Sequence, residues 1–171
     1  TTAEDVVFTI ERQRDPQTAS PRQADVAAVQ RVVARDSFTV EVTLSRTGLY
    51  TVNSLLEVVP VPKHLLEGVT AAEMRNAPFG RAPVGNGFYR FGSWNAGQNL
   101  TLRADSTKPD GTAAIDRIVM RFIPDMNAAL TELQTGQGDL LQRLPPSNRE
   151  RIMQVPVVEV YSAPRIRPAW L

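Results

Sequence analysis

The stretch of residues 2–14, Thr-Ala-Glu-Asp-Val-Val-Phe-Thr-Ile-Glu-Arg-Gln-Arg, predicts an amphipathic helix near the start of the chain. A Thr N-cap followed by two acids suits the first turn of a helix, because the carboxylates face the positive end of the helix dipole. The valines, Phe8 and Ile10 then recur at helical spacing. The pattern predicts a helix from about Ala3 to Arg14 that stops at Asp15-Pro16.

The segments that follow, up to residue 80, predict a mixture of short elements. Residues 32–44 predict a β-hairpin with one buried face, because β-branched and polar residues alternate on both sides of the polar turn Asp36-Ser37. The other expected elements are a short helix over 24–31, a helix over 48–57, an extended segment over 58–62 and a short turn of helix over 63–67.

A run of Pro and Gly within residues 78–87 marks a change in composition and predicts a module boundary near Gly80. Beyond it, we expect strands at 88–91, 99–103 and 115–123, and then a helix that Asp125 caps and Gly136 ends. The remaining expected elements are a short buried strand at 138–141, a helix from Pro145 or Pro146 to about Gln154, and a strand at 157–161. This order of elements predicts an α/β (mixed α+β) fold with a mixed sheet.

Composition excludes several classes of protein. The 171 residues include 19 Lys and Arg, 18 Asp and Glu, one His and no Cys. Without Cys there is neither a disulfide framework nor a thiolate metal site, and one His cannot build a zinc site alone. The nearly balanced, scattered charge argues against a nucleic-acid partner. No apolar run approaches the roughly 20 residues that cross a bilayer.

The sequence contains no clear catalytic motif. Gly85-Asn86-Gly87 lacks the third Gly of a dinucleotide fingerprint and precedes a strand, so it predicts a tight turn. His64 is the one imidazole, and no nucleophile motif accompanies it. The residues favour a binding or structural protein over an enzyme and call for no cofactor; a hydrolase built on His64 with a nearby Ser or Asp is the minor alternative.

Several phrases together resemble one protein family. Residues 2–8 are similar to the "T-A-x-D-V-V-F" helix of family 5 extracellular solute-binding proteins, the peptide- and nickel-binding components of bacterial ABC importers. The further matching phrases follow in the family's order, at residues 15–21, 36–40, 60–64, 83–89, 123–130, 134–140 and 163–167.

The resemblance implies part of a periplasmic-binding-protein type II-like lobe. Residues 1–80 would form part of the smaller side domain of lobe one, and residues 81–171 part of its main domain. Family members are much longer, so the resemblance also implies that this chain is an excerpt without the second lobe. We therefore expect the isolated chain to bind ligand weakly or not at all and to self-associate through uncovered apolar surface.

The resemblance also places residues on one wall of the ligand cleft: Arg22, Leu141, Gln142, Arg143 and Arg167. At Arg22 the family's peptide binders often have an aromatic residue. An Arg there favours a ligand with a carboxylate or phosphate, or else simply faces solvent.

The function implied by the resemblance is capture of a peptide or similar small solute at the periplasmic or extracellular face of the bacterial cytoplasmic membrane. The solute is then delivered to the membrane permease of an ABC importer, without covalent chemistry. The alternative is a short interaction module that keeps the fold and binds a protein partner.

Overall fold

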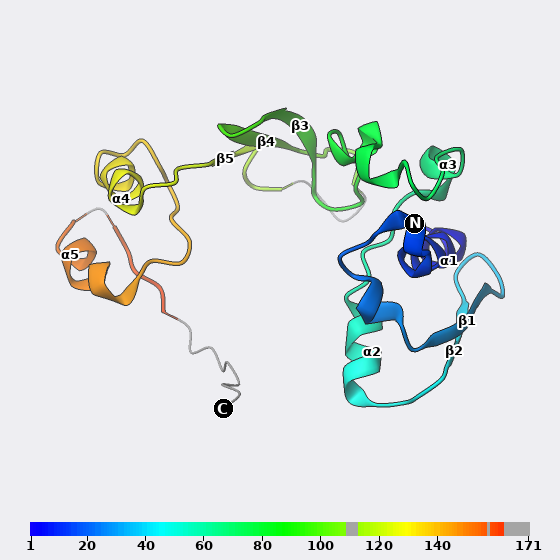
Figure 1. Ribbon diagram of the computed structural model, residues 1–171. Coiled ribbons are helices and arrows are strands. Elements are labelled where there is room, and N and C mark those ends of the chain that lie inside the picture. Colours follow the sequence, from blue (N-terminus) through cyan, green and yellow to red (C-terminus); the bar gives the residue numbers. More distant parts are fainter. Residues whose placement is uncertain (109–112, 157, 163–171) are drawn as a thin grey trace. The chain divides into compact units, whose positions relative to one another are not determined.

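The computed structural model describes residues 1–108, 113–156 and 158–162 (Figure 1). The chain forms two compact units, Thr1–Met120 and Arg121–Leu171. The boundary expected near Gly80 lies inside the first unit, and the assignment of residues 1–80 and 81–171 to two family domains stays a prediction. No helix within the described ranges is long and apolar enough to cross a membrane.

Helix α1 (Ala3–Arg14) confirms the first prediction. The backbone N–H of Thr2 donates to Asp5 Oδ2 at 2.8 Å, so a carboxylate satisfies a backbone group that the helix itself leaves free. After the helix, Asp15 Oδ1 accepts from the N–H of Gln17 at 2.8 Å and opens the 3₁₀ helix η1 (Pro16–Thr18). The buried face of α1 carries Ala3, Thr9 and Ile10 into the core.

The core of the first unit lies between α1 and a two-stranded antiparallel sheet, formed by β1 (Val29–Ala34) and β2 (Val40–Leu44). Its fully buried members are Ile10, Val26, Val29 and Val32. The predicted hairpin is therefore correct, and one face of it is buried against α1.

The expected helix over residues 24–31 is wrong. A 3₁₀ helix, η2 (Gln23–Val26), and a two-residue turn are followed by β1, which pairs Val29 with Leu44 and Ala34 with Val40. The valines every third residue fit either element locally. Pairing with β2, supported by β-branched side chains, prevails over the helical alternative.

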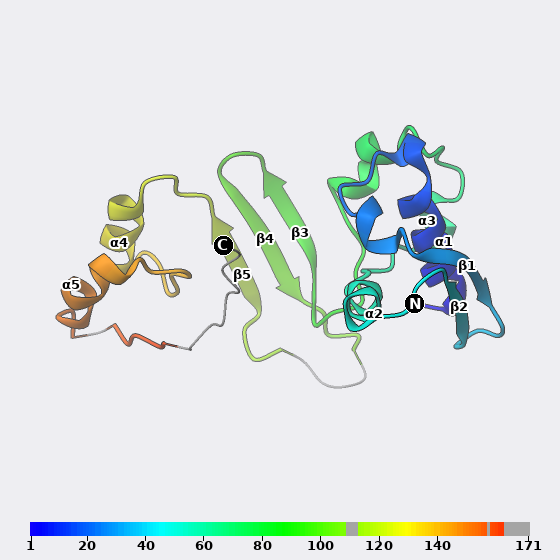
Figure 2. The same ribbon diagram turned by 60° about the horizontal axis from the view of Figure 1, so that its bottom comes forward.

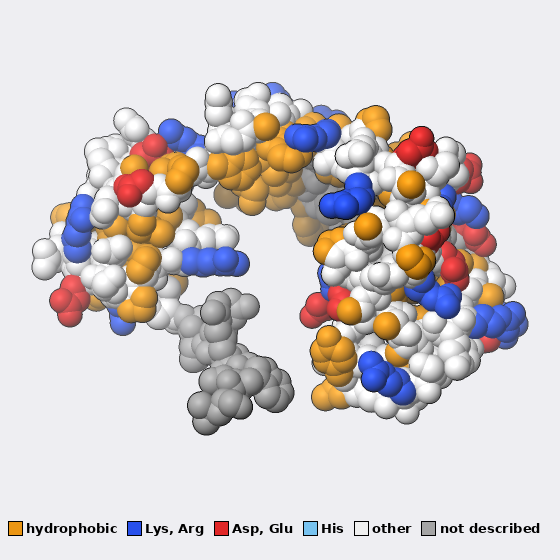
Figure 3. All heavy atoms as spheres, viewed as in Figure 1, with side chains coloured by type: hydrophobic (Ala, Val, Ile, Leu, Met, Phe, Trp, Pro, Cys, Tyr) orange, Lys and Arg blue, Asp and Glu red, His pale blue; other side chains and the backbone are white. Residues whose placement is uncertain are grey.

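Helices α2 (Leu49–Leu56) and α3 (Lys63–Leu66) lie where the sequence predicted them. The face of α2 that is buried carries the small polar residues Thr51 and Ser54, whereas Leu49 and Leu56 are each 78% exposed. Hydrophobic side chains accordingly gather on the surface over α2 (Figure 3). Two 3₁₀ helices, η3 (Met74–Asn76) and η4 (Pro78–Gly80), complete this part of the unit.

Side chains of α1 hold the extended segment that leads into α3. The hydroxyl of Thr9, 3% exposed, donates to the carbonyl of Asp5 and accepts from the N–H of Val61 at 2.8 Å. Asp5 Oδ1 accepts from the N–H of Lys63 at 2.8 Å. Because Pro60 and Pro62 have no N–H, Val61 and Lys63 are the backbone donors of residues 60–63, and side chains of α1 satisfy both.

A second sheet has the order β3-β4-β5, with strands Tyr89–Asn95, Asn99–Ala104 and Arg117–Arg121 (Figure 2). Gly97 adopts a φ of 74° in the turn that joins β3 to β4. The β3–β4 register shifts between Phe91 and Ser93. At Gly92, inside this irregularity, an added Cβ would lie 3.0 Å from the carbonyl oxygen of Thr101.

The second unit contains α4 (Met126–Gln134), capped by Asp125, whose Oδ1 accepts from the N–H of Ala128 at 2.8 Å. Gly136 follows the helix with a φ of 70°, as the sequence predicted. At the start of this unit, Arg121 Nη1 lies 2.6 Å from Oε2 of Glu132 in α4 and forms an ion pair with it. The 3₁₀ helix η5 (Pro146–Asn148) and α5 (Arg149–Met153) confirm the helix expected from Pro145 or Pro146.

Two expected strands of this unit are wrong. Residues 138–141 have no strand structure, and Leu140 is 79% exposed instead of buried. Residues 158–161 are likewise irregular, and Val157 lies outside the described residues. A strand forms only beside a hydrogen-bonded neighbour, and within the described part of the chain these segments pair with none.

The Asp5 carboxylate predicts an acid-sensitive contribution to stability. Hydrogen bonds from the N–H groups of Thr2 and then Lys63 lower the pKa of Asp5 below 3.8. Its contribution is complete above that unfolded-state value and is lost as pH falls through the folded pKa. Asp5→Asn should lower the free energy of unfolding by about 1–2 kcal/mol at pH 7, and the difference from wild type should shrink below pH 4, as measured by urea unfolding across pH.

Glu4→Gln is the matched control for Asp5→Asn. It removes an acid from the same helix turn, but the Glu4 carboxylate pairs with the exposed ammonium of Lys63, at 2.7 Å. Exposed ion pairs contribute little. Equal losses for the two variants would contradict a special role for Asp5.

Thr9 gives a second prediction. Thr9→Val keeps the volume but leaves the N–H of Val61 without its acceptor, and an unpaired buried donor costs about 1–3 kcal/mol. Thr9→Ser retains the hydroxyl and should recover most of the loss. Thermal and urea unfolding check both variants, and a Thr9→Val protein as stable as wild type would refute the contact.

Gly92→Ala should destabilise the β3–β4 hairpin, because its Cβ meets backbone at 3.0 Å and backbone cannot move aside cheaply. Gly80→Ala is the control, since an added Cβ there has nothing within 4 Å. We expect a lower melting temperature for Gly92→Ala and almost none of this change for Gly80→Ala. Similar melting temperatures for both would contradict the close approach at Gly92.

Candidate functional site

Arg22 begins η2, and its backbone is fixed locally. Its N–H donates to the hydroxyl oxygen of Ser20 at 3.2 Å. This short-range contact sets where the side chain leaves the main chain, between η1 and η2.

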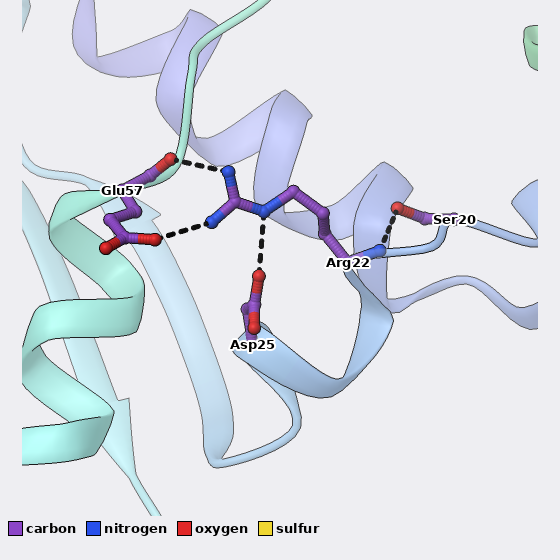
Figure 4. Close-up of polar contacts among 4 residues, drawn as sticks. All are labelled: Ser20, Arg22, Asp25 and Glu57. Atoms are coloured by element: carbon purple, nitrogen blue, oxygen red, sulfur yellow. Dashed lines mark hydrogen bonds and ion pairs between the residues drawn. The ribbon is translucent and has the colours of Figure 1, made fainter. Parts of the chain in front are cut away.

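The guanidinium of Arg22 contacts two acidic residues (Figure 4). Nε donates to Asp25 Oδ2 at 2.7 Å. Nη1 donates to the carbonyl oxygen of Glu57 at 3.1 Å, and Nη2 donates to Glu57 Oε2 at 3.2 Å. Arg22 therefore ties η2 to the C-terminal end of α2.

These acids set the electrostatics of the site. The hydrogen bond to Asp25 raises the pKa of Arg22, and Coulomb attraction to Asp25 and Glu57 acts in the same direction. The Arg22 side chain is 38% exposed, so solvent reaches it. One guanidinium and two carboxylates form a local ion-pair network.

Asp25 and Glu57 were not among the residues that the sequence analysis named. The spacing of Arg22 and Asp25, three residues apart, is a local signal for such a pair. Glu57 is 35 residues from Arg22, so no local pattern connects them.

The other cleft-wall candidates lie in the second unit or outside the described residues. Leu141 is half-buried, whereas Gln142 and Arg143 are exposed. The backbone of Arg143 has a φ of 60°, a conformation uncommon for a residue with a side chain. Arg22 belongs to the first unit, Leu141, Gln142 and Arg143 belong to the second, and Arg167 lies outside the described residues.

Two other places in the molecule were considered as sites. His64 is exposed on α3, and no group of three or more potential metal ligands occurs among the residues that the structure describes. A depression of about 440 Å³ on α1, which the sequence analysis did not predict, is lined by Phe8, Glu11, Arg12, Arg14 and Asp15. There the Arg12 guanidinium lies 5.0 Å above the Phe8 ring and donates through Nη2 to the carbonyl of Val69, so its contacts are structural.

Comparison with known proteins gives a match along the chain. Residues 1–171 match the family described as bacterial extracellular solute-binding proteins, family 5 Middle. The oligopeptide-binding protein AppA of Bacillus subtilis (strain 168) is 31% identical over 137 residues, which are 79% of this chain and 25% of that protein.

Solved structures agree with the sequence match. The structure of B. subtilis AppA in complex with a nonapeptide has a TM-score of 0.84 at 26% identity and covers 91% of this chain and 31% of that chain. MoaA from A. tumefaciens R10 in complex with mannopinic acid has a TM-score of 0.76 at 31% identity, over 91% of this chain and 31% of that one.

The likeness confirms the predicted fold class, a mixed α/β fold that forms part of a periplasmic-binding-protein type II-like structure. The chain spans about a quarter of the length of the curated relatives it matches. On these matches, the chain belongs to family 5 of the bacterial extracellular solute-binding proteins.

Proposed function

We propose that this protein is the solute-binding component of an ABC importer and captures a peptide or similar small solute outside the cytoplasmic membrane. The observation that carries the proposal is the match of residues 1–171 to the family model. AppA is named as an oligopeptide-binding protein, and MoaA was solved with mannopinic acid, so both relatives support a role in binding small solutes. The relatives lend no support to a short partner-binding module.

In this proposal the chain supplies part of one wall of the binding cleft. Arg22, Leu141, Gln142, Arg143 and Arg167 are the proposed contacts. Arginine side chains and backbone groups at such a wall bind by hydrogen bonds, which strengthen when water is excluded from a closed cleft. No covalent step is required, and we propose that the protein is not an enzyme.

The proposal has two further parts. The solute would pass to a membrane permease of the importer, at the periplasmic or extracellular face of the membrane. Residues 1–80 would belong to the side domain of the first lobe and residues 81–171 to its main domain. The run of Pro and Gly around Gly80, which contains η4 and the residues leading to β3, supports a junction between the two domains there.

Native mass spectrometry of the protein isolated from the bacterial envelope tests the proposal. We expect a retained small solute, seen as a mass above that of the polypeptide and released on unfolding. Protein stripped of solute by unfolding and refolding should bind the identified compound again in calorimetry.

The control is the same protein treated with a large excess of an unrelated sugar, which should not displace the retained solute. A protein that carries no solute, and that after refolding binds neither di- to pentapeptides nor small organic acids, would contradict the proposed function.

A further inference from the structure

Two of the three contacts of the Arg22 guanidinium are independent of the Glu57 side chain. Nε is held by Asp25 at 2.7 Å, and Nη1 is held by the backbone carbonyl of Glu57 at 3.1 Å. The plane of the guanidinium is therefore fixed whichever group binds the third nitrogen, Nη2. A guanidinium with a fixed plane is a preorganised receptor for a carboxylate.

The contact of Nη2 with the Glu57 carboxylate is the weakest of the three. Its distance is 3.2 Å, and the Glu57 side chain is 73% exposed, against 26% for Asp25. An ion pair this exposed contributes little, because water solvates the carboxylate almost as well as the guanidinium does. Release of the Glu57 carboxylate into water therefore has a small cost.

We propose that the Glu57 carboxylate is a built-in competitor, which a carboxylate group of the solute replaces on Nη2 of Arg22. This inference rests on the proposed function and makes Arg22 and Glu57 a specificity-determining pair. In the exchange one carboxylate substitutes for another, so the charge facing the guanidinium does not change. Asp25 stays bound to Nε and keeps the receptor oriented.

The competitor has a consequence for selectivity. Asp25 already balances the charge of Arg22, so a bare anion such as acetate binds weakly and displaces the Glu57 carboxylate only at high concentration. A solute gains only by presenting an oxygen in the position of Glu57 Oε2 while the rest of the molecule binds elsewhere in the cleft. The pair thus favours solutes with a carboxylate at one end and rejects their neutral analogues.

The probes are the tripeptide Ala-Ala-Ala with a free C-terminal carboxylate and the same peptide with a C-terminal amide. Binding to the protein as it occurs in the bacterial envelope, produced with ¹⁵N-labelled arginine, is followed by NMR of the arginine Nε–H groups, in which Arg22 is assigned by the signal lost in Arg22→Lys. In the wild type the acid should shift the Arg22 signal and the amide should not. In Glu57→Gln the dissociation constant of the acid should fall about two- to fivefold and that of the amide should stay the same.

Glu150→Gln is the matched control, because it removes an equally charged, exposed side chain in the second unit. It should change neither affinity. Thermal unfolding of each variant establishes that the fold is retained. If Glu57→Gln leaves the ratio of acid to amide affinity unchanged while the peptides bind, the exchange is overturned and the proposed function stands.

Sodium acetate, compared with sodium chloride at the same ionic strength, distinguishes a failure of the carboxylate exchange from a failure of the proposed peptide binding. If neither tripeptide binds but acetate shifts the Arg22 signal more in Glu57→Gln than in the wild type, peptide binding fails and the exchange stands. If acetate also has no such effect, the exchange is overturned as well.

Discussion

Two side chains on one face of α1 position a large part of the first unit. Asp5 and Thr9 accept the N–H groups of Lys63 and Val61, and Arg12 from the same helix donates to the carbonyl of Val69. Side chains of α1 thus form hydrogen bonds with the backbone of a neighbouring extended segment. The path from α2 to α3 depends on these contacts, because prolines leave the segment few hydrogen bonds of its own.

The same constraint explains how Arg22 finds its partners. Arg22 bonds both the backbone and the carboxylate of Glu57, which follows α2 and precedes the segment held by α1. The end of α2 is therefore fixed on one side by η2 and on the other by the attachment of the segment to α1. Arg22, which the family resemblance places at the cleft wall, therefore also has a structural role in the folded chain.

The elements that the sequence predicted well are those with local signals. The Thr cap and acids of α1, the Asp cap of α4 and the alternating pattern of the β1–β2 hairpin act within a few residues. The wrong predictions concern segments whose secondary structure depends on a partner that is distant in the sequence. Residues 29–31 begin strand β1 because β2 lies alongside, and residues 138–141 pair with no strand in the described part of the chain. The burial of Thr51 in place of Leu49 likewise depends on packing against η2, which helical spacing does not report.

The hydrogen bonds between α1 and the proline-flanked segment also fix its register. Side chains four residues apart on a helix are separated by about 6 Å, and two residues of extended chain advance by about 6.5 Å, so the two spacings are commensurate. Acceptors at Asp5 and Thr9 therefore match donors at Lys63 and Val61. If the segment slipped by one residue so that Thr9 and Asp5 faced Pro60 and Pro62, both hydrogen bonds would be lost together; a slip in the other direction would place Pro62 at Thr9 and lose that bond. The alternation of proline with other residues therefore disfavours a shifted alignment of the segment.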